Sequence, residues 1–424
     1  MDADERLLLR PGPERPAVSV RWDRDRLVTA RRGDTVSLAL LDQGILETSR
    51  SAKYRRPRGP YCLQGDCGTC LVRIDGLPNR RACLTAVREG IRVEPQNRLI
   101  SGPDPTVLID TMMRSGMDHH HFMVRPRVVN QIMQGVARNL TGFGTLPDRE
   151  PEHPARHEIH RPDVLVVGAG PAGRAAWSVL SAAGLDVLWL DRRDRGGLGT
   201  EAGPPPEALL PHTGVFGVYP QEQLWAAMSD VPEQAEVLRS IFPRQVLLAT
   251  GARDPIIPLP NNDRPGVVAA RGLLRQLERS GARLRADDVV VIGEGEHAAS
   301  LAEDLGTEAV APERVDRIEG NPVEALRLRD GRRSCRLVAL AAPPAPAYEL
   351  ARQAGASVAW ESGGFAVQRD DDGRCVREPW PVWVAGDMTG YLGERRAAMD
   401  GERVARALLR NHPPASPSSP SSRP

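Results

Sequence analysis

Residues 61–83 read YCLQGDCGTCLVRIDGLPNRRAC and hold four of the six cysteines in the chain. The spacing is C-x4-C-x2-C-x12-C, and the four residues are Cys62, Cys67, Cys70 and Cys83. The first three match the ligand run of plant-type [2Fe–2S] proteins. Gly65 and Gly68 stand between them, and glycine can take the positive φ that lets backbone N–H groups point at sulfur. The stretch therefore predicts a [2Fe–2S] cluster held by these four thiolates.

Zinc and disulfide bonding are the alternatives for these cysteines. Structural zinc sites usually use paired C-x2-C units, and this chain has one such pair. The N-terminal stretch MDADERLLLR has no apolar core of a secretory signal, so we expect a cytoplasmic, reducing compartment. Cys335 and Cys375 have no cysteine near them in sequence and are expected to be ordinary, partly buried thiols.

Length and charge set the outer limits. A chain of 424 residues suggests about two to four domains. The 56 Lys+Arg and 55 Asp+Glu leave a net charge of +1, which gives no general argument for nucleic acid or an anionic membrane as a partner. No apolar stretch approaches the length of a membrane span. Residues 412–424 are rich in Pro and Ser and are expected to form a disordered tail.

The residues before and after the cysteines follow the order of a β-grasp ferredoxin domain, predicted over residues 1–102. Apolar and polar residues alternate from Val18 to Trp22, and a second strand follows from Leu27 to Ala30. Thr35 or Asp34 is placed to cap a short helix that carries Val36 to Leu41. The cysteine loop comes next, and then a strand over 71–74 that ends at the turn Asp75-Gly76.

A glycine-rich loop marks a second domain. The apolar run 163–167 leads directly into Gly168-Ala-Gly170-Pro-Ala-Gly173, and a helix is predicted from Ala175 to Ala183. A second apolar strand over 187–190 ends at Asp191. In such units the first glycine makes the turn, the second admits the pyrophosphate and the third packs the helix on the strand. Asp191 is expected to accept hydrogen bonds from ribose hydroxyls.

Two later segments favour FAD over NAD at this loop. Val246 to Ala252 resembles the ATG motif of two-dinucleotide flavoproteins, with Thr250 and Gly251 at its centre. Val382 to Asp387 resembles their closing motif, in which Gly386 and Asp387 meet the flavin nucleotide and a helix follows, here expected over 394–409. The FAD-binding domain is therefore predicted to be discontinuous, formed by residues 161–264 and 379–411, after a connector over 103–160.

A second nucleotide-like unit lies between these two parts, predicted as an inserted NAD(P)-type domain over 265–378. The run 288–292 leads to Gly293-Glu-Gly295-Glu-His-Ala298, a GxGxxA pattern. Glu294 and Glu296 place negative charge where phosphates would lie, and the next strand, near 308–311, has no clear acidic end. A degenerate fold is the favoured interpretation, and NAD(P) binding stays open. The predicted class is α/β and β-grasp: a ferredoxin-like domain, then a Rossmann-like FAD domain with this insertion.

Other patterns yield no catalytic residue. His119, His120 and His121 cannot all face one point on a regular helix or strand, and no carboxylate stands at ligand spacing, so a structural or flavin-contacting role is favoured over a metal site. No CxxC or CxxxxC stands near either glycine loop, which argues against a disulfide reductase. No Ser/His/Asp nucleophile arrangement can be proposed.

Several of these stretches together resemble one family. They are the RPRG run before the cysteine loop, Met117-DHHHFMVRPR, GAGPAG, Thr213-GVFGVYPQ and Ala249-TGARDPIIPLPNNDRPGV. The chain resembles, over about residues 15–410, the alpha subunit of heterotetrameric sarcosine oxidase and its relatives in opine oxidases, hydrogen cyanide synthase and dye-linked proline dehydrogenases. The alpha subunit of sarcosine oxidase continues into a folate-binding half, and this chain stops before it. The extra cysteine-rich domain of some dehydrogenase relatives has no counterpart, and the segment 199–245 is short.

The resemblance implies an electron-transfer subunit that carries FAD and the [2Fe–2S] cluster. Its expected partner is an FAD-dependent amine or amino-acid oxidase (beta) subunit within a hetero-oligomer, and that partner would oxidise the substrate. A stand-alone NAD(P)H:acceptor reductase is the second hypothesis. A non-catalytic scaffold with degenerate nucleotide sites is the third, and a reducible cluster argues against it.

Overall fold

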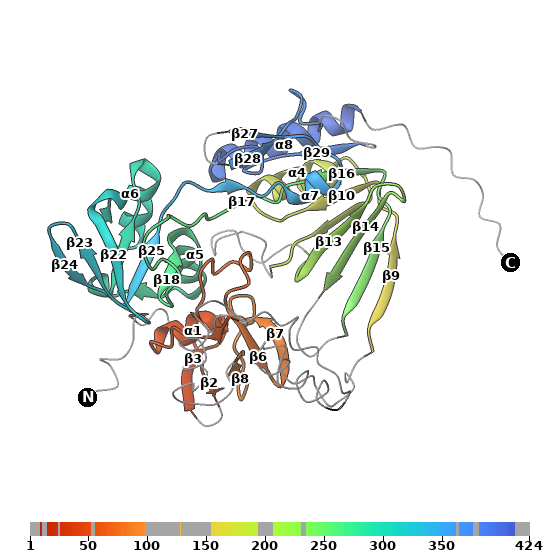
Figure 1. Cartoon of the computed structure of the whole chain (residues 1–424). Coiled ribbons are helices and arrows are strands. Elements are labelled where there is room, and N and C mark those ends of the chain that lie inside the picture. The colour runs from red at the N-terminus through yellow and green to blue at the C-terminus, as the bar shows by residue number, and fades with distance from the viewer. Residues whose placement is uncertain are drawn as a thin grey trace. The chain divides into compact units, whose positions relative to one another are not determined.

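The computed structural model describes residues 9–10, 15–23, 26–51, 56–97, 128, 154–193, 207–229, 235–361, 364–375 and 381–411. The chain divides into two compact units, each formed by two stretches of sequence. Unit 1 contains Met1–Pro151 and Asp254–Pro343, and unit 2 contains Glu152–Arg253 and Pro344–Pro424. Figure 1 shows their elements, and each unit is described by itself.

The first part of unit 1 is a sheet of five described strands in the order β3-β2-β8-β6-β7. Their bounds are Arg26–Arg31, Ala17–Trp22, Arg92–Pro95, Leu71–Ile74 and Leu77–Arg81. Strand β2 alternates exposed and buried residues along its whole length, because one face of the sheet is turned to the core. The predicted hairpin and the predicted strand over 71–74 are confirmed.

Helix α1 (Val36–Asp42) covers this sheet, and its start is the one that the sequence predicts. Thr35 is the N-cap, and its Oγ1 accepts a hydrogen bond from the N–H of Leu38 at 3.2 Å. Such a cap satisfies a donor that the first helical turn leaves without a partner. The next residues, from Val36 to Leu41, are all buried. A short pair, β4 (Ser49–Arg50) with β5 (Pro57–Arg58), precedes the cysteine loop.

The second part of unit 1 is a parallel sheet in the order β18-β25-β20-β21. These strands span Val267–Ala269, Leu337–Leu340, Val289–Ile292 and Ala309–Val310. Helices α5 (Ala270–Ser280) and α6 (Gly295–Asp304) follow β18 and β20. An antiparallel sheet of β22, β23 and β24 spans Val315–Gly320, Val323–Leu328 and Gly331–Ser334. The remaining elements are β1 (Leu9–Arg10), β19 (Arg283–Leu284), η4 (Ala286–Asp288) and η5 (Pro312–Arg314).

The two parts of unit 1 share their hydrophobic core. One buried cluster contains Val20 and Leu40 of the first part together with Leu273 and Leu277 of α5. A second buried cluster joins Tyr61 and Cys62 to residues of β18, β20 and β25. The cysteine domain therefore packs on the second part of unit 1 as one body, because neither core is complete without side chains from the other part.

Unit 2 contains a parallel sheet in the order β12-β11-β10-β16-β29. The strands span Leu209–Leu210, Val187–Leu190, Val164–Val167, Gln245–Leu248 and Val382–Val384. Every residue of β10 and β16 is buried, as expected for inner strands covered on both faces. Val164 and Val166 face helices α4 (Pro171–Ala182) and α8 (Glu394–Arg410), while Leu165 and Val167 belong to the core on the other face.

A four-stranded sheet, β13-β14-β15-β9, lies on that other face of unit 2. Its strands span Thr213–Tyr219, Leu224–Ser229, Val237–Ile241 and Arg156–His160. Helix α7 (Glu349–Gln353), the pair β17 (Ala252–Arg253) with β26 (Ala345–Pro346), and the hairpin β27 (Val358–Glu361) with β28 (Gly364–Val367) complete the unit.

The predicted start of the helix after the first glycine loop is wrong. The helix begins at Pro171, directly after Gly170, rather than at Ala175. Proline fits the first helical position because its missing N–H would have no partner there. The helix predicted over 394–409 is confirmed as α8, which ends one residue later.

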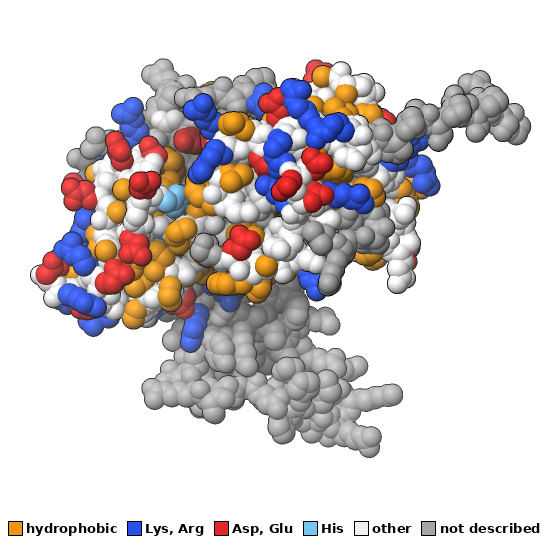
Figure 2. Space-filling model, turned by 90° about the horizontal axis from the view of Figure 1, so that it is seen from above, with side chains coloured by type: hydrophobic (Ala, Val, Ile, Leu, Met, Phe, Trp, Pro, Cys, Tyr) orange, Lys and Arg blue, Asp and Glu red, His pale blue; other side chains and the backbone are white. Residues whose placement is uncertain are grey.

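Within the described ranges, no helix has the length and apolarity needed to cross a bilayer. The face of the molecule seen in Figure 2 carries basic and acidic side chains intermixed. This mixing agrees with the net charge of +1 and gives that face no field of a single sign.

Candidate functional site

The cysteine loop of unit 1 brings backbone N–H groups to the first predicted ligand. The N–H groups of Gln64, Asp66 and Cys67 lie 3.5, 3.2 and 3.3 Å from Cys62 Sγ. Gly65 has φ +83°, and Gly68 has φ +68°, values that favour glycine. Donors aimed at sulfur stabilise a thiolate, which is the form that binds iron.

The remaining three cysteines lie around the same loop. Cys70 Sγ and Cys83 Sγ are 3.4 Å apart, and both side chains are buried. Cys67 is exposed, and its Sγ lies 3.1 Å from Thr69 Oγ1. Hydrogen bonds from the Cys67 and Cys83 thiols, outweighing burial, lower the pKa of Cys62 to about 2. The donor set therefore fits a thiolate-bound cluster.

In the described part of the chain, no group of three or more His, Cys, Asp or Glu side chains is arranged around one metal ion. A [2Fe–2S] cluster sets a different requirement, because its four ligands are divided between two irons.

Helix α5 packs directly on the cysteine loop, a contact that the sequence reasoning missed. Gln276 donates from Nε2 to the carbonyl oxygen of Leu63 at 2.7 Å and to that of Cys83 at 3.4 Å. A Cβ added at Gly272 would come within 2.0 Å of the Cys62 carbonyl oxygen, so the helix backbone touches the loop. The available signal was a glutamine on the buried face of α5, beside Leu273 and Leu277.

The first glycine loop lies in unit 2, between β10 and α4. Gly168 has φ +108°, and a Cβ there would come within 2.2 Å of the Ala249 carbonyl oxygen. At Gly173 a Cβ would come within 2.0 Å of the Gly168 carbonyl oxygen. Gly170 has open space around it and is the N-cap of α4. The loop therefore has the close helix–strand packing and the free helix N-terminus that a pyrophosphate site requires.

Asp191 holds this loop from the end of β11. Its Oδ2 accepts a hydrogen bond from the N–H of Ala169 at 2.8 Å, and its Oδ1 accepts one from the N–H of Arg193 at 2.8 Å. Burial by itself would raise the pKa of Asp191, but the Arg193 guanidinium and these N–H groups hold it below its ordinary value. The carboxylate is thus ionised and is already bound to the chain itself.

A cavity of about 250 Å³ opens beside the loop, within unit 2. Three predicted site residues line it: Gly168, Asp191 and Thr250. The other walls come from the start of β13, at Thr213 to Phe216, and from α7. The Thr250 hydroxyl donates to the Ala347 carbonyl oxygen at 2.8 Å, which ties the ATG-like segment to this wall. Gly251 follows with φ +75°, outside the lining.

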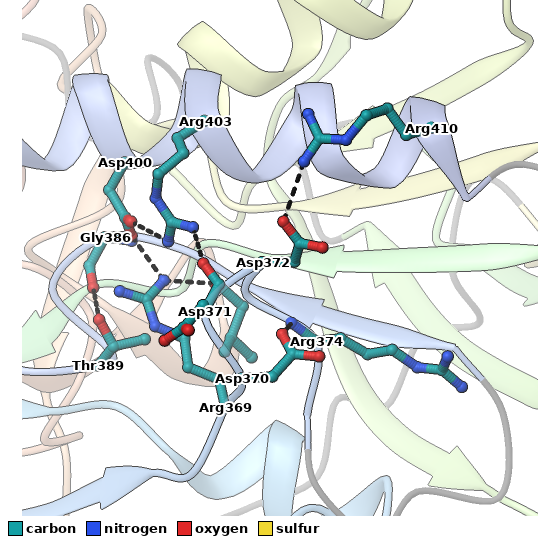
Figure 3. Close-up of polar contacts among 11 residues, drawn as sticks. Arg369, Asp370, Asp371, Asp372, Arg374, Gly386, Thr389, Asp400, Arg403 and Arg410 are labelled. Atoms are coloured by element: carbon teal, nitrogen blue, oxygen red, sulfur yellow. Dashed lines mark hydrogen bonds and ion pairs between the residues drawn. The ribbon is translucent and has the colours of Figure 1, made fainter.

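The closing motif of unit 2 is fixed by charged groups, drawn in Figure 3. The N–H of Gly386 donates to Asp400 Oδ2 at 2.9 Å, and Arg369 Nη1 donates to the same oxygen at 2.8 Å. Arg403 binds Asp400 Oδ1 at 2.7 Å. Burial opposes ionisation of Asp400, but these donors lower its pKa. Asp387 Oδ1 accepts hydrogen bonds from the N–H groups of Leu392 and Gly393, before α8.

The second glycine loop lies in unit 1, between β20 and α6. A Cβ at Gly293 would come within 2.6 Å of the Ala341 carbonyl oxygen, and Gly295 has φ +77° with open space around it. Glu294 and Glu296 are exposed at the start of α6. The backbone plan of a nucleotide loop is therefore present, and the charge at the helix N-terminus is unfavourable for phosphate.

Some predicted features lie outside the described residues. These are His119 to His121, most of the predicted connector, the tail from 412 and residues 194–206 of the short segment. The predicted domain boundaries and ligand assignments stay predictions.

Comparison with known proteins agrees with the iron–sulfur part. Residues 15–98 match the 2Fe-2S iron-sulfur cluster binding domain family. The chain is 30% identical over 290 residues to the alpha subunit of sarcosine oxidase from Corynebacterium sp. (strain U-96), covering 60% of this chain and 26% of that protein. It is 38% identical over 80 residues to HcnA, a subunit of hydrogen cyanide synthase from Pseudomonas protegens, covering 19% of this chain and 75% of that protein.

Among solved structures, L-proline dehydrogenase from P. horikoshii is similar, with a TM-score of 0.70 and 20% identity, over 96% of this chain and 76% of that chain. This likeness shows the fold. The molecule is a protein with an N-terminal 2Fe-2S domain and a mixed α/β fold of the two-dinucleotide type. It belongs to the sarcosine oxidase alpha-like family of oxidoreductase subunits, which includes HcnA and an opine oxidase component. The chain spans about a quarter of the length of the sarcosine oxidase alpha subunits that it matches.

Proposed function

We propose that this chain is the FAD- and [2Fe–2S]-containing electron-transfer subunit of a multi-subunit dehydrogenase or oxidase that acts on an amine, an opine or an amino acid such as sarcosine or proline. The observation that carries the proposal is the cysteine loop, in which three N–H groups meet Cys62 Sγ and the buried Cys70 and Cys83 lie 3.4 Å apart. The names of the family members supply the class of substrate.

The cysteine loop supplies ligands and donors. Cys62, Cys67, Cys70 and Cys83 would bind the two irons, and the loop N–H groups would offset the negative charge on sulfur. A bound [2Fe–2S] cluster exchanges one electron at a time, whereas a flavin handles two. The exposure of Cys67 leaves one edge of the site open to solvent, and the other three cysteines are buried.

Unit 2 would hold the FAD. The turn at Gly168 to Gly173 and the N-terminus of α4 favour a pyrophosphate, and Asp191 keeps acceptor capacity for a ribose hydroxyl beside its own two contacts. Thr250, Gly251, Gly386 and Asp387 would complete the flavin nucleotide site. The cavity of about 250 Å³ is smaller than a typical pocket for a drug-sized ligand, roughly 300–1,000 Å³, and suits one half of a dinucleotide.

Substrate oxidation is assigned to a partner. We assign no acid or base for it within the described residues, so an FAD-dependent beta subunit is proposed to take hydride from the substrate. Such a partner makes the working protein a hetero-oligomer. Copurification of this chain from its native host with a flavoprotein would support the assignment, and amine oxidation by the isolated chain alone would contradict it.

The test begins with anaerobically purified protein. Its visible spectrum, the EPR spectrum after dithionite reduction and the amount of extracted flavin are measured together. We expect a rhombic [2Fe–2S] signal and stoichiometric FAD. Zinc, or no metal, at the four cysteines would overturn the proposal, and a cluster without flavin would reduce the chain to a ferredoxin on a scaffold.

A further inference from the structure

Gln276 joins the two ends of the predicted ligand set. Its Nε2 donates to the carbonyl oxygen of Leu63, which follows the first cysteine, and to that of Cys83, the last one. Its Oε1 accepts a hydrogen bond from Thr35 Oγ1 at 2.8 Å. The side chain is 6% exposed, so these bonds form away from water. A buried amide that spends both donors on backbone carbonyls fixes the distance between those carbonyls.

The contact occurs at the carboxyl end of a parallel strand. The N–H of Ala269, the last residue of β18, donates to the Tyr61 carbonyl oxygen at 2.8 Å. Gly272, in the first turn of α5, touches the Cys62 carbonyl oxygen. Sheets of this kind bind their ligands outside the carboxyl ends of the strands. In unit 1 the cysteine loop itself occupies the end of β18.

A buried ion pair extends the contact to the middle of the loop. Arg271 Nε binds Asp254 Oδ1 at 2.6 Å, and their side chains are 9% and 5% exposed. Gln64 donates from Nε2 to Asp254 Oδ2 at 2.7 Å, and its Oε1 accepts a hydrogen bond from Arg275. Gln64 lies between the first and second cysteines. The loop is therefore held at three points: before the first cysteine, between the first two, and at the last.

We propose that the second part of unit 1, built like a nucleotide-binding domain, serves as the seat of the cluster loop, and that Gln276 is the residue that positions the ligands. The inference rests on the proposed function, because it takes Cys62 and Cys83 as cluster ligands. Gln276 acts through backbone carbonyls rather than through sulfur, so its role is positioning. It sets the relative placement of the first and last cysteines, and with it the environment of the cluster.

The test uses the full chain with its native cofactors. Gln276→Glu keeps the size of the side chain and removes the amide donors, and Gln276→Leu removes every polar contact. Gln64→Ala removes the contact from the loop side and leaves α5 unchanged. Glu278→Gln, at an exposed position of the same helix, is the matched control. For each variant the EPR g values, the cluster midpoint potential and the rate of iron release to a chelator are measured, with circular dichroism as the check on folding.

We expect Gln276→Glu and Gln276→Leu to change the g values and to speed iron release about ten- to hundredfold. Gln64→Ala should act in the same direction, and Glu278→Gln should match the wild type. A folded Gln276→Glu protein with wild-type g values, potential and iron release would overturn the inference and leave the proposed function intact. A wild-type protein without the [2Fe–2S] signal would overturn both.

Discussion

The two glycine-rich loops share a backbone plan and differ in what surrounds it. Gly168 to Gly173 leads into a helix whose first turn has no acidic residue, and a buried Asp191 braces the loop beside a cavity. Gly293 to Ala298 leads into a helix with Glu296 in its first turn. Strand geometry alone thus does not make a nucleotide site. The charge at the helix N-terminus and the carboxylate at the next strand separate the two loops.

The largest effect is expected from Gly173→Val. The new side chain would collide with the Gly168 carbonyl oxygen, which lies 2.0 Å from the position of a Cβ. Flavin extracted from the purified variant should fall almost to zero, while the cluster EPR signal of unit 1 persists. Gly331→Ala, where a Cβ meets nothing within 4 Å, is the control and should retain its flavin. Full flavin content in Gly173→Val would break the comparison.

Asp400→Asn tests the charges that hold Gly386 beside the first loop, since a Cβ at Gly386 would lie 2.7 Å from Ala172 of α4. Losing a charged acceptor of three donors should lower the free energy of unfolding by about 1–3 kcal/mol at pH 7. Asp330→Asn is the matched control in unit 1. It removes an exposed pair with Arg314 and should leave the stability unchanged.

The effect of Asp400 should depend on pH. Its folded-state pKa lies below the ordinary value of 3.8, so its stabilisation is complete above that value and is lost as the pH falls through the folded pKa. Thermal unfolding curves of wild type and Asp400→Asn should therefore converge below about pH 4. A difference that persists at lower pH would mean that packing, rather than the carboxylate charge, holds this segment.

Pro171→Glu copies the charge of the second loop into the first, because Pro171 corresponds to Glu296 in the two patterns. A carboxylate at the N-terminus of α4 should repel a pyrophosphate and weaken FAD binding about tenfold. Pro171→Ala controls for the loss of proline. Flavin fluorescence during dilution measures the dissociation constant, and equal affinity in both variants would remove charge as the distinguishing factor.

The smallest effect is expected from the double variant Glu294→Ala, Glu296→Ala. We expect the wild type to leave its flavin oxidised in NADH or NADPH. The variant should gain about tenfold or less in affinity, because β21 ends without an acidic residue for a ribose. Anaerobic titration of flavin absorbance measures this. Rapid bleaching of the wild type by NADH would make the second loop a working site and would favour the stand-alone reductase.

The local features of the fold could be predicted from the sequence because their causes are local. The Thr35 cap, the alternation along β2 and the positive φ of Gly65 each depend on residues a few positions apart. The start of α4 also has a local cause, since Pro171 suits the first helical position, and the predicted start at Ala175 gave that signal no weight.

The packing around the cysteine loop could not be predicted in the same way. Gln276 and Leu63 are 213 positions apart, and nothing in the helix sequence ARGLLRQLERS names its partner. A polar residue in a buried stripe indicates only that some partner exists. The ligand residues follow from spacing, whereas the groups that position them depend on long-range packing.

The contacts of Asp191 have a consequence for the assembly of the protein. Because the chain itself supplies both donors that brace the first glycine loop, the loop keeps its shape before any nucleotide arrives. Little ordering then accompanies binding, so association should be fast and affinity should be set mainly by the rate of escape. Stripped protein should take up its dinucleotide again in a single kinetic phase, without a slow refolding step.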